Sequence, residues 1–166
     1  MLRSAVCAFV VIFVVGCAGS LTRLSEADKR IHATALIPHQ SQQQLLVGTR
    51  IWMESQFTER PDSVTYDDNA GGVVSAVGRI DYDCAWLECL SKGDWQVYFS
   101  MRVTANDGEI QTLFQRIRLV APAADANASG AMNSPLWSQR DLDNIRPALL
   151  DLNRKLEHFL RQRGGA

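Results

Sequence analysis

Apolar and polar side chains alternate along residues 95–104, and this alternation constrains the fold more than any other feature of the sequence. Successive side chains of a strand point to opposite faces, so the pattern predicts a strand with one covered face and one open face. Asn106-Asp107-Gly108 follows, and Asn and Gly tolerate the positive φ of a tight turn. A return strand is therefore expected over 109–120. The side chains expected to face the core are Trp95, Val97, Phe99, Met101 and Val103.

Three further segments have strand patterns. Apolar residues alternate over 30–37, and Pro38 stops the run. A short strand is expected over 63–66, and a longer one over 72–82, which is rich in Val and Ile. This longer strand and the two strands of the hairpin would form a meander.

Two segments carry apolar residues at helical spacing. Ser41, with Gln44 three residues on, is a capping-box signature that predicts a helix over 41–57. A second helix is expected after Ser138, where Asp141 gives a loose capping signal, and Pro147 either kinks it or marks its first turn. The stripes expected to face the core are Leu45, Leu46, Thr49, Trp52, Met53 and Phe57 in the first helix, and Leu142, Ile145, Leu149, Leu152, Leu156 and Phe159 in the second.

The order of elements predicts an α+β fold. Two amphipathic helices would cover one face of an antiparallel sheet of about four to five strands, which gives a two-layer domain. We expect a single domain over 29–166, interrupted by a flexible loop at 122–135 that is small, polar and aperiodic. Its composition, with 46% hydrophobic and 21% charged residues, is that of an ordinary globular chain.

The N-terminal segment predicts a lipoprotein signal peptide over 1–16. Arg3 precedes an apolar run over 5–15 that is too short to span a bilayer. Val14-Val15-Gly16-Cys17 resembles the lipobox of bacterial lipoproteins, which implies cleavage after Gly16 and attachment of diacylglycerol and a further acyl chain such as palmitate at Cys17. Several acyl chains anchor a protein stably, whereas one is marginal. The alternative is a secreted protein or a membrane-retained stub in which Cys17 is incidental.

Residues 17–28 would tether the domain to the membrane, since Ala18-Gly19-Ser20 is small and flexible. Ala18, in place of an aspartate after the cysteine, favours the outer over the inner membrane, with the domain facing the periplasm. The chain has 17 Lys and Arg against 18 Asp and Glu. Without a basic surplus, we expect no nucleic-acid partner.

Cys84 and Cys89 would pair in an oxidising envelope and so form a structural disulfide. Two free thiols are the alternative, and a redox or metal role is disfavoured because four residues separate the cysteines and no His is nearby. Trp86 and Leu87 lie between them, and an exposed apolar loop there could contact a partner or a membrane. They could equally fold back over the sheet edge.

The sequence offers no catalytic or metal constellation, so we expect no enzyme activity, metal or cofactor. Its histidines, His32, His39 and His158, are each isolated from a nucleophile or an orienting carboxylate in sequence. The turn carboxylates lack the spacing of a calcium loop and are attributed to turn chemistry; they are Asp62, Asp67, Asp68, Asp81 and Asp83. Asp151 and Glu157 interleave with the basic residues of the last helix, which predicts a solvated face.

Trp52, followed by the stretch Tyr66-Asp67-Asp68-Asn69-Ala70-Gly71-Gly72-Val73-Val74-Ser75-Ala76-Val77-Gly78 and later by Asp107-Gly108, resembles domain-of-unknown-function family 4468. The resemblance covers about 31–120 and implies a fold like that of the TATA-binding protein. It carries over no catalytic residues. The segment 83–93, with its two cysteines, departs from the family pattern.

The leading functional hypothesis is a lipid-anchored envelope protein that acts as a non-catalytic binding or interaction module. The alternative is a small-ligand-binding or lipid-binding lipoprotein, with a pocket between the strand that starts at Trp95 and the last helix. An enzyme would need polar groups such as Tyr98 and Arg102 to converge on the open sheet face.

Overall fold

The computed structural model describes residues 24–57, 64–67, 72–84, 89–121, 133–135 and 138–164. In chain order the elements are β1 (Ile31–Leu36), α2 (Gln42–Gln56), β2 (Val64–Asp67), β3 (Val73–Asp81), α3 (Cys89–Lys92), β4 (Gln96–Asn106), β5 (Glu109–Val120), β6 (Asn133–Pro135) and α4 (Gln139–Gly164). The predicted strands and helices all form, with ends that differ by a residue or two.

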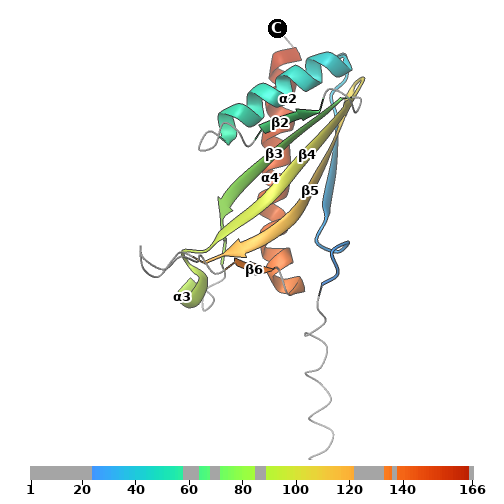
Figure 1. The fold of residues 1–166 in the computed structure, drawn as a ribbon. Coiled ribbons are helices and arrows are strands. Elements are labelled where there is room, and N and C mark those ends of the chain that lie inside the picture. The colour runs from blue at the N-terminus through green and yellow to red at the C-terminus, as the bar shows by residue number, and fades with distance from the viewer. Residues whose placement is uncertain are drawn as a thin grey trace, which may run out of the picture.

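The described strands form one antiparallel sheet in the order β1-β5-β4-β3-β2 (Figure 1). The predicted meander is confirmed, because β3, β4 and β5 are neighbours through most of their length. β1, the first strand in sequence, pairs with the distant β5. The short β6 pairs with the last residues of β5, along the edge that β1 occupies further up.

A β-bulge in β5 keeps the apolar side chains of this strand on the core side of the sheet. The register with β4 shifts between Tyr98 and Ser100, and Arg116 opposite this step has a φ of 55°. The extra residue in β5 lets Ile117, rather than Arg116, turn inward after Phe114. The apolar side chains of β5 therefore stay on one face despite the break in strict alternation.

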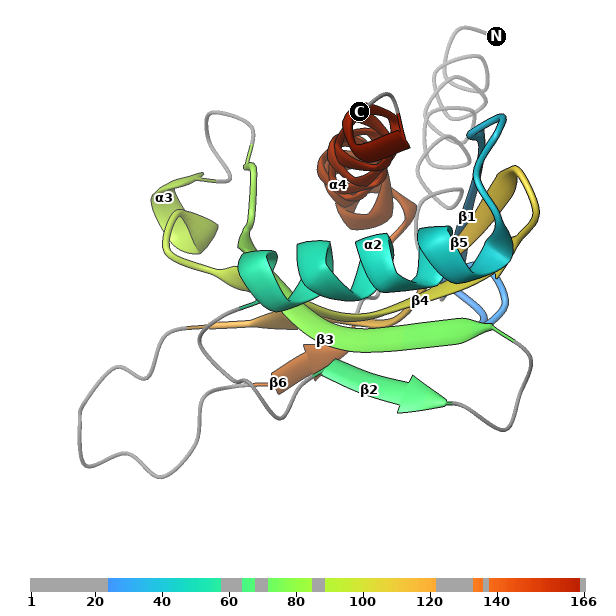
Figure 2. The same cartoon turned by 90° about the horizontal axis from the view of Figure 1, so that it is seen from above.

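Both long helices lie on the same side of the sheet (Figure 2). α2 packs over β3 and β4, while α4 packs over β1 and against α2. Ser41 is the N-cap of α2, and its capping box with Gln44 is confirmed. The expected α+β, two-layer architecture is thus the observed one.

The core lies between the sheet and the helices, and aromatic rings connect its layers. Trp52 and Phe57 of the α2 end pack edge-to-face with centroids 6.1 Å apart. Phe57 packs in the same way on Phe99 of β4 at 6.1 Å, and Phe99 packs on Phe114 of β5 at 5.7 Å. Such edge-to-face pairs add to the free energy gained from burial.

Two glycines allow close approach in this core. A Cβ on Gly78 of β3 would lie 2.5 Å from Phe57 Cε1 and 2.7 Å from Phe99 Cζ. A Cβ on Gly48 of α2 would lie 2.5 Å from Leu160 Cδ2 of α4. Gly78 thus makes room for aromatic rings against the sheet, and Gly48 for the crossing of the two helices.

The structure decides one alternative that the sequence left open, the position of Pro147, and corrects two details. α4 begins at Gln139, so Pro147 lies in its interior rather than in its first turn. The apolar stripe of α4 ends on Leu160, which is fully buried, whereas Phe159 is half-buried at the edge of the core. Part of the predicted loop 122–135 forms β6, because Asn133–Pro135 pairs with the end of β5 beyond β1.

No described helix is long and apolar enough to cross a membrane.

Candidate functional site: the outer face of the sheet

The face of the sheet turned away from α2 and α4, here called the outer face, is polar. No helix among the described elements covers it (Figure 2). This polarity follows from the alternation on each strand. Most side chains that point toward the helices are buried, and most that point away are half-buried or exposed, although Val73 on the outward side is buried. Its side chains include His32, Thr34 and Leu36 on β1, Gln111, Leu113 and Arg118 on β5, Tyr98, Ser100, Arg102 and Thr104 on β4, and Ser75, Val77 and Arg79 on β3.

A hollow of about 270 Å³ lies on this face over β1, β5 and β4. Its outward-facing lining residues are His32, Thr34, Arg102, Thr104, Gln111 and Leu113. The strand register arranges them in two rows across the sheet. Leu113 pairs with His32 on one side and Arg102 on the other, and Gln111 pairs with Thr34 and Thr104 in the same way.

Arg102 is the charged residue at the centre of the outer face. It is exposed, and within the described residues no carboxylate pairs with it. Gln111 Nε2 donates a hydrogen bond to Glu109 Oε1 at 2.7 Å, which places one acidic residue near the turn end of the hollow. Arg118 and Arg79 flank Tyr98 in the cross-strand register further along the same face.

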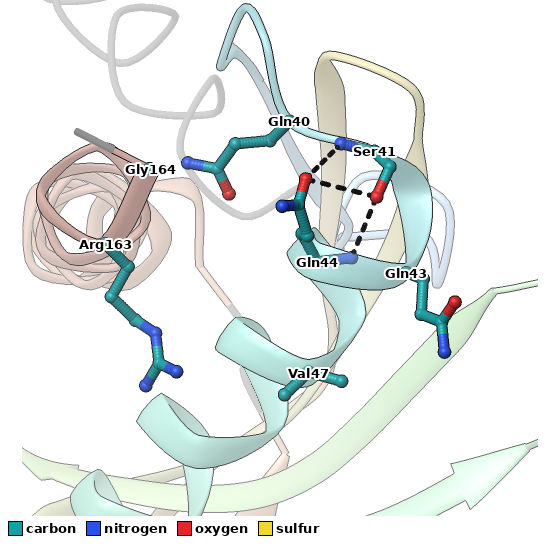
Figure 3. Close-up of a pocket in the computed structure, with 7 residues that line it drawn as sticks. All are labelled: Gln40, Ser41, Gln43, Gln44, Val47, Arg163 and Gly164. Atoms are coloured by element: carbon teal, nitrogen blue, oxygen red, sulfur yellow. Dashed lines mark hydrogen bonds between the residues drawn. The ribbon is translucent and has the colours of Figure 1, made fainter. Parts of the chain in front are cut away.

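A second concavity, of about 450 Å³, lies where the start of α2 meets the end of α4 (Figure 3). It is lined by Gln40, Ser41, Gln43, Gln44, Val47, Arg163 and Gly164. Several of its polar groups hold the helix ends together. Gln40, which is only 7% exposed, donates from Nε2 to the Leu160 carbonyl at 2.6 Å.

Two backbone N–H groups in the first turn of α2 already donate hydrogen bonds within the protein. The backbone N–H of Gln44 donates to Ser41 Oγ, and the backbone N–H of Gln42 donates to Asp107 Oδ1 at 2.7 Å. The Arg163 guanidinium lies 5.6 Å from the centroid of the Phe159 ring. We therefore interpret this cleft as the junction of α2, α4 and the β4–β5 turn.

A polar cluster around Asp141 ties the opposite end of α4 to the sheet. The Asp141 carboxylate accepts hydrogen bonds from Lys92 Nζ at 2.8 Å, Ser138 Oγ at 2.7 Å and Tyr82 Oη at 3.1 Å. Asn144 Nδ2 donates to the same Tyr82 oxygen at 3.1 Å. The Lys92 ammonium also lies 5.5 Å from the centroid of the Tyr82 ring and 5.8 Å from that of Trp95.

Asp141 stays ionised in this cluster. Burial alone would raise the pKa of its carboxyl, but hydrogen bonds from Lys92 and Ser138, the charge of Lys92 and the Tyr82 hydroxyl together hold the pKa below its usual value. Each polar group of Asp141 is thus engaged with a neighbour. The cluster joins α3 and the end of β3 to the first turn of α4, which is a structural role.

The three histidines lie on different parts of the fold. His32 lies exposed on the outer face, His39 lies in the turn before α2 with a φ of 69°, and His158 is exposed on α4. No group of three His, Cys, Asp or Glu side chains in the described ranges is placed to hold a metal ion. The interleaved charges of α4 form local ion pairs, as expected for a solvated face: Arg154 and Lys155 with Asp151, and Arg161 with Glu157.

Several predicted site residues lie outside the described residues, namely Cys17, Trp86 and Leu87, as do Asp62 and Asp68. Cys84 is half-buried against the core after β3, and Cys89 begins α3. The expected pocket between β4 and α4 coincides with the core itself. Val97, Phe99 and Met101 of β4 and Leu142, Ile145 and Leu149 of α4 are buried there in one cluster, and neither concavity described above lies between them.

Sequence reasoning identified the faces of the strands but missed the hollow. The alternation over 95–104 already assigns Arg102 and Thr104 to the open face. The other half of the hollow comes from β1, whose position beside β5 is a pairing between distant segments. No local signal in the sequence specifies that pairing.

The sheet order, with a helix after the first strand, a final helix, and both helices on one face, defines the class of protein as an α+β domain with a TBP-like fold. More specifically, the chain belongs to the family described as a domain of unknown function (DUF4468) with TBP-like fold, whose family model matches residues 33–119. The predicted resemblance is confirmed.

Two solved structures are similar to this chain. One is a DUF4468 family protein from Bacteroides ovatus, with a TM-score of 0.51 and 19% identity, over 82% of this chain and 86% of that one. The other is a TBP-like protein from Parabacteroides distasonis, with a TM-score of 0.56 and 9% identity, over 80% of this chain and 92% of that one. At these identities the likeness shows the fold alone. No curated protein matches the sequence.

Proposed function

We propose that this protein is a lipid-anchored cell-envelope protein whose domain is a non-catalytic binding or interaction module. The observation that carries the proposal is the outer face. Most of its side chains carry hydroxyls, amides or guanidinium groups, with Leu36, Val77 and Leu113 between them, and some of them line a hollow. A polar face on a sheet suits recognition, because pairing between the strands already orders the backbone, so that binding costs only the freedom of the side chains.

The proposed anchor is Cys17, and its support is the sequence Val14-Val15-Gly16-Cys17. Diacylglycerol and an additional acyl chain on this residue would hold the domain at a membrane surface. A bacterial envelope is also oxidising, so we propose that Cys84 and Cys89 are paired there. The short loop that such a disulfide closes would contribute about 2 kcal/mol of stability.

A second candidate function is the binding of a small ligand. It is favoured by the hollow of about 270 Å³, which has an arginine and several hydrogen-bonding side chains around an apolar residue, Leu113. Binding sites commonly combine a concave shape with a few placed polar groups.

The proposed function is tested by photo-crosslinking in cells. A photoreactive amino acid is placed at Val77, which is 50% exposed on the outer face, or at Val47, which is 50% exposed on α2 and serves as the matched control. We expect a stoichiometric crosslinked partner from position 77 and none from position 47. We also expect Cys17→Ser to release the protein from the membrane fraction and to abolish the crosslink.

Other results would contradict particular parts of the proposal. A membrane-bound Cys17→Ser protein would overturn the lipid anchor. A partner captured equally from both positions would show that the outer face is not the specific binding surface. The absence of any partner, combined with a small molecule retained in native mass spectrometry, would favour the second candidate function.

A further inference from the structure

We propose that the hollow on the outer face binds a small ligand bearing an oxyanion, either a carboxylate or a phosphate, and that Arg102 binds the oxyanion. The inference rests on the proposed function, because it takes the outer face as the binding surface and specifies what that surface recognises. It concerns the ligand chemistry of one hollow rather than the presence of a macromolecular partner.

The first argument is the state of the Arg102 side chain compared with other arginines of the domain. Arg50 pairs with Glu54 at 2.8 Å, Arg154 with Asp151 at 3.0 Å and Arg161 with Glu157 at 2.8 Å. Arg102 lies in the middle of the sheet, and among the described residues it has no such partner. Arg118 and Arg146 also have none there, but Arg102 alone of the three lines the hollow. Its cross-strand neighbours are Leu113 and Ser75, neither of which is acidic.

The second argument is the chemistry of the side chains around Arg102. Thr34 and Thr104 contribute hydroxyls, Gln111 contributes an amide and His32 contributes a ring. Side chains directly opposite one another on paired strands are separated by about 5 Å, so groups from β1, β5 and β4 can reach one small molecule together. A planar guanidinium matches the geometry of a carboxylate or phosphate with two parallel hydrogen bonds.

Glu109, an acidic residue beside the hollow, sets the expected orientation of the ligand. Its carboxylate accepts a hydrogen bond from Gln111 Nε2 and lies toward the β4–β5 turn. A like charge repels an anion, so the oxyanion should bind at the Arg102 end of the hollow. The ligand's uncharged polar part would then lie beside Thr34 and Gln111.

The size of the hollow limits the ligand. A volume of about 270 Å³ is slightly below the range of about 300–1,000 Å³ that is typical of drug-sized ligand pockets. It therefore suits one oxyanion with a few further heavy atoms. The net charge of the whole chain is −1, so any attraction of an anion must come from this local arrangement.

The inference is tested by NMR titration of the full-length, ¹⁵N-labelled protein in detergent micelles. Sodium phosphate is added in one arm and sodium succinate in the other, with the ionic strength held constant by NaCl. We expect saturable shifts of backbone amides in β1, β4 and β5 in at least one arm, and the arm that binds more tightly identifies the preferred oxyanion. Arg102→Gln should raise the Kd at least about tenfold, because it removes a charge-assisted bidentate contact.

Arg146→Gln is the matched control, since Arg146 is an exposed arginine on α4, away from the outer face. Arg146→Gln should leave the Kd unchanged. Arg102→Lys should give an intermediate Kd, because lysine keeps the positive charge but lacks the planar guanidinium that forms two parallel hydrogen bonds. The amide spectrum of each variant without anion reports whether its fold is intact.

The absence of saturable shifts in both arms would overturn the inference, and so would an Arg102→Gln protein that binds as tightly as the parent. A failure here is distinguishable from a failure of the proposed function. A partner crosslinked from Val77, together with no response to either anion, would leave the interaction module in place and remove only the oxyanion site.

Discussion

At the scale of single residues, Asp141 illustrates how a carboxylate can lie in the interior at little cost. Its side chain is 11% exposed, and Lys92, Ser138 and Tyr82 all donate to it. A buried charge is tolerated when it is both paired and hydrogen-bonded. Because the donors come from three segments of the chain, the loss of this one carboxylate should affect the whole junction.

We predict that Asp141→Asn lowers the free energy of unfolding by about 1–3 kcal/mol at neutral pH, because the charged acceptor of the hydrogen bonds from Lys92, Ser138 and Tyr82 is lost. Urea unfolding followed by circular dichroism measures the effect. Asp151→Asn is the control, since that carboxylate pairs with Arg154 and Lys155 on an exposed helix face and should matter little. Equal effects of the two substitutions would contradict a stabilising Asp141 cluster.

The same residue predicts a dependence of stability on pH. The pKa of Asp141 in the folded protein lies below its usual value of 3.8, so the ionised carboxylate stabilises the fold at pH values above 3.8. This contribution is lost as the pH falls through the folded pKa. The difference in unfolding free energy between parent and Asp141→Asn should therefore shrink between about pH 5 and pH 2. A difference that stays constant over that range would refute the assignment.

The two close-packed glycines, Gly78 and Gly48, should differ in how much an alanine substitution lowers the stability of the protein. Gly78→Ala would force a Cβ against two aromatic rings, Phe57 and Phe99, and should cost about 1–3 kcal/mol through overpacking. Gly48→Ala meets only the terminal methyl of Leu160, which can rotate, and it gains about 1 kcal/mol in helix propensity. Thermal unfolding of both variants should show the larger loss at Gly78, and the reverse order would contradict the packing described here.

At the scale of elements, α4 is the least expected one, because it continues through a proline. Pro147 lies on the exposed side of the helix, where Asp143 would otherwise accept an amide hydrogen bond from position 147. The helix persists because its apolar stripe, from Leu142 to Leu160, is buried along the core. Tertiary packing thus overrides an unfavourable local residue.

We predict that Pro147→Ala raises the free energy of unfolding by about 1–2 kcal/mol. The helix would gain a hydrogen bond and lose a steric clash, which together are worth about 3 kcal/mol, and the more flexible unfolded chain would offset part of the gain. Chemical unfolding measures the change. Ala148→Gly, in the same turn, should lower stability by about 1 kcal/mol if that turn is helical in solution. A Pro147→Ala protein less stable than the parent would show that the proline conformation is required.

At the scale of the whole molecule, the one-sided arrangement of helices determines what the protein can offer to a ligand. The inward side chains of the sheet are used to build the core with α2 and α4. The outward side chains are mostly hydroxyls, amides and arginines, with Arg102 at the centre and Leu36, Val77 and Leu113 among them. Function is accordingly proposed on this face, and the crosslinking from Val77 and the anion titration of Arg102→Gln both examine it.

The sequence by itself determined the long helices, the strands β1 to β5 and the faces of this protein, because these depend on local periodicity, whereas the short α3 and β6 were not predicted. Ser41 and Gln44 predicted the start of α2, and Asn106-Asp107-Gly108 predicted the hairpin turn. The alternation over 95–104 distinguished the side chains that face the core from those on the outer face. The bulge at Arg116 was not predicted, since the sequence predicted only a return strand over 109–120 and no register with its neighbour.

Only the tertiary structure decided which distant residues meet. β1 lies beside β5, and that pairing brings His32 and Thr34 next to the row of Arg102 and creates the hollow. Tyr82, Lys92 and Asp141 likewise come from three separate segments. Such contacts depend on how complete elements pack and pair across the sheet, and the free energy of that packing is not encoded in any short window of sequence.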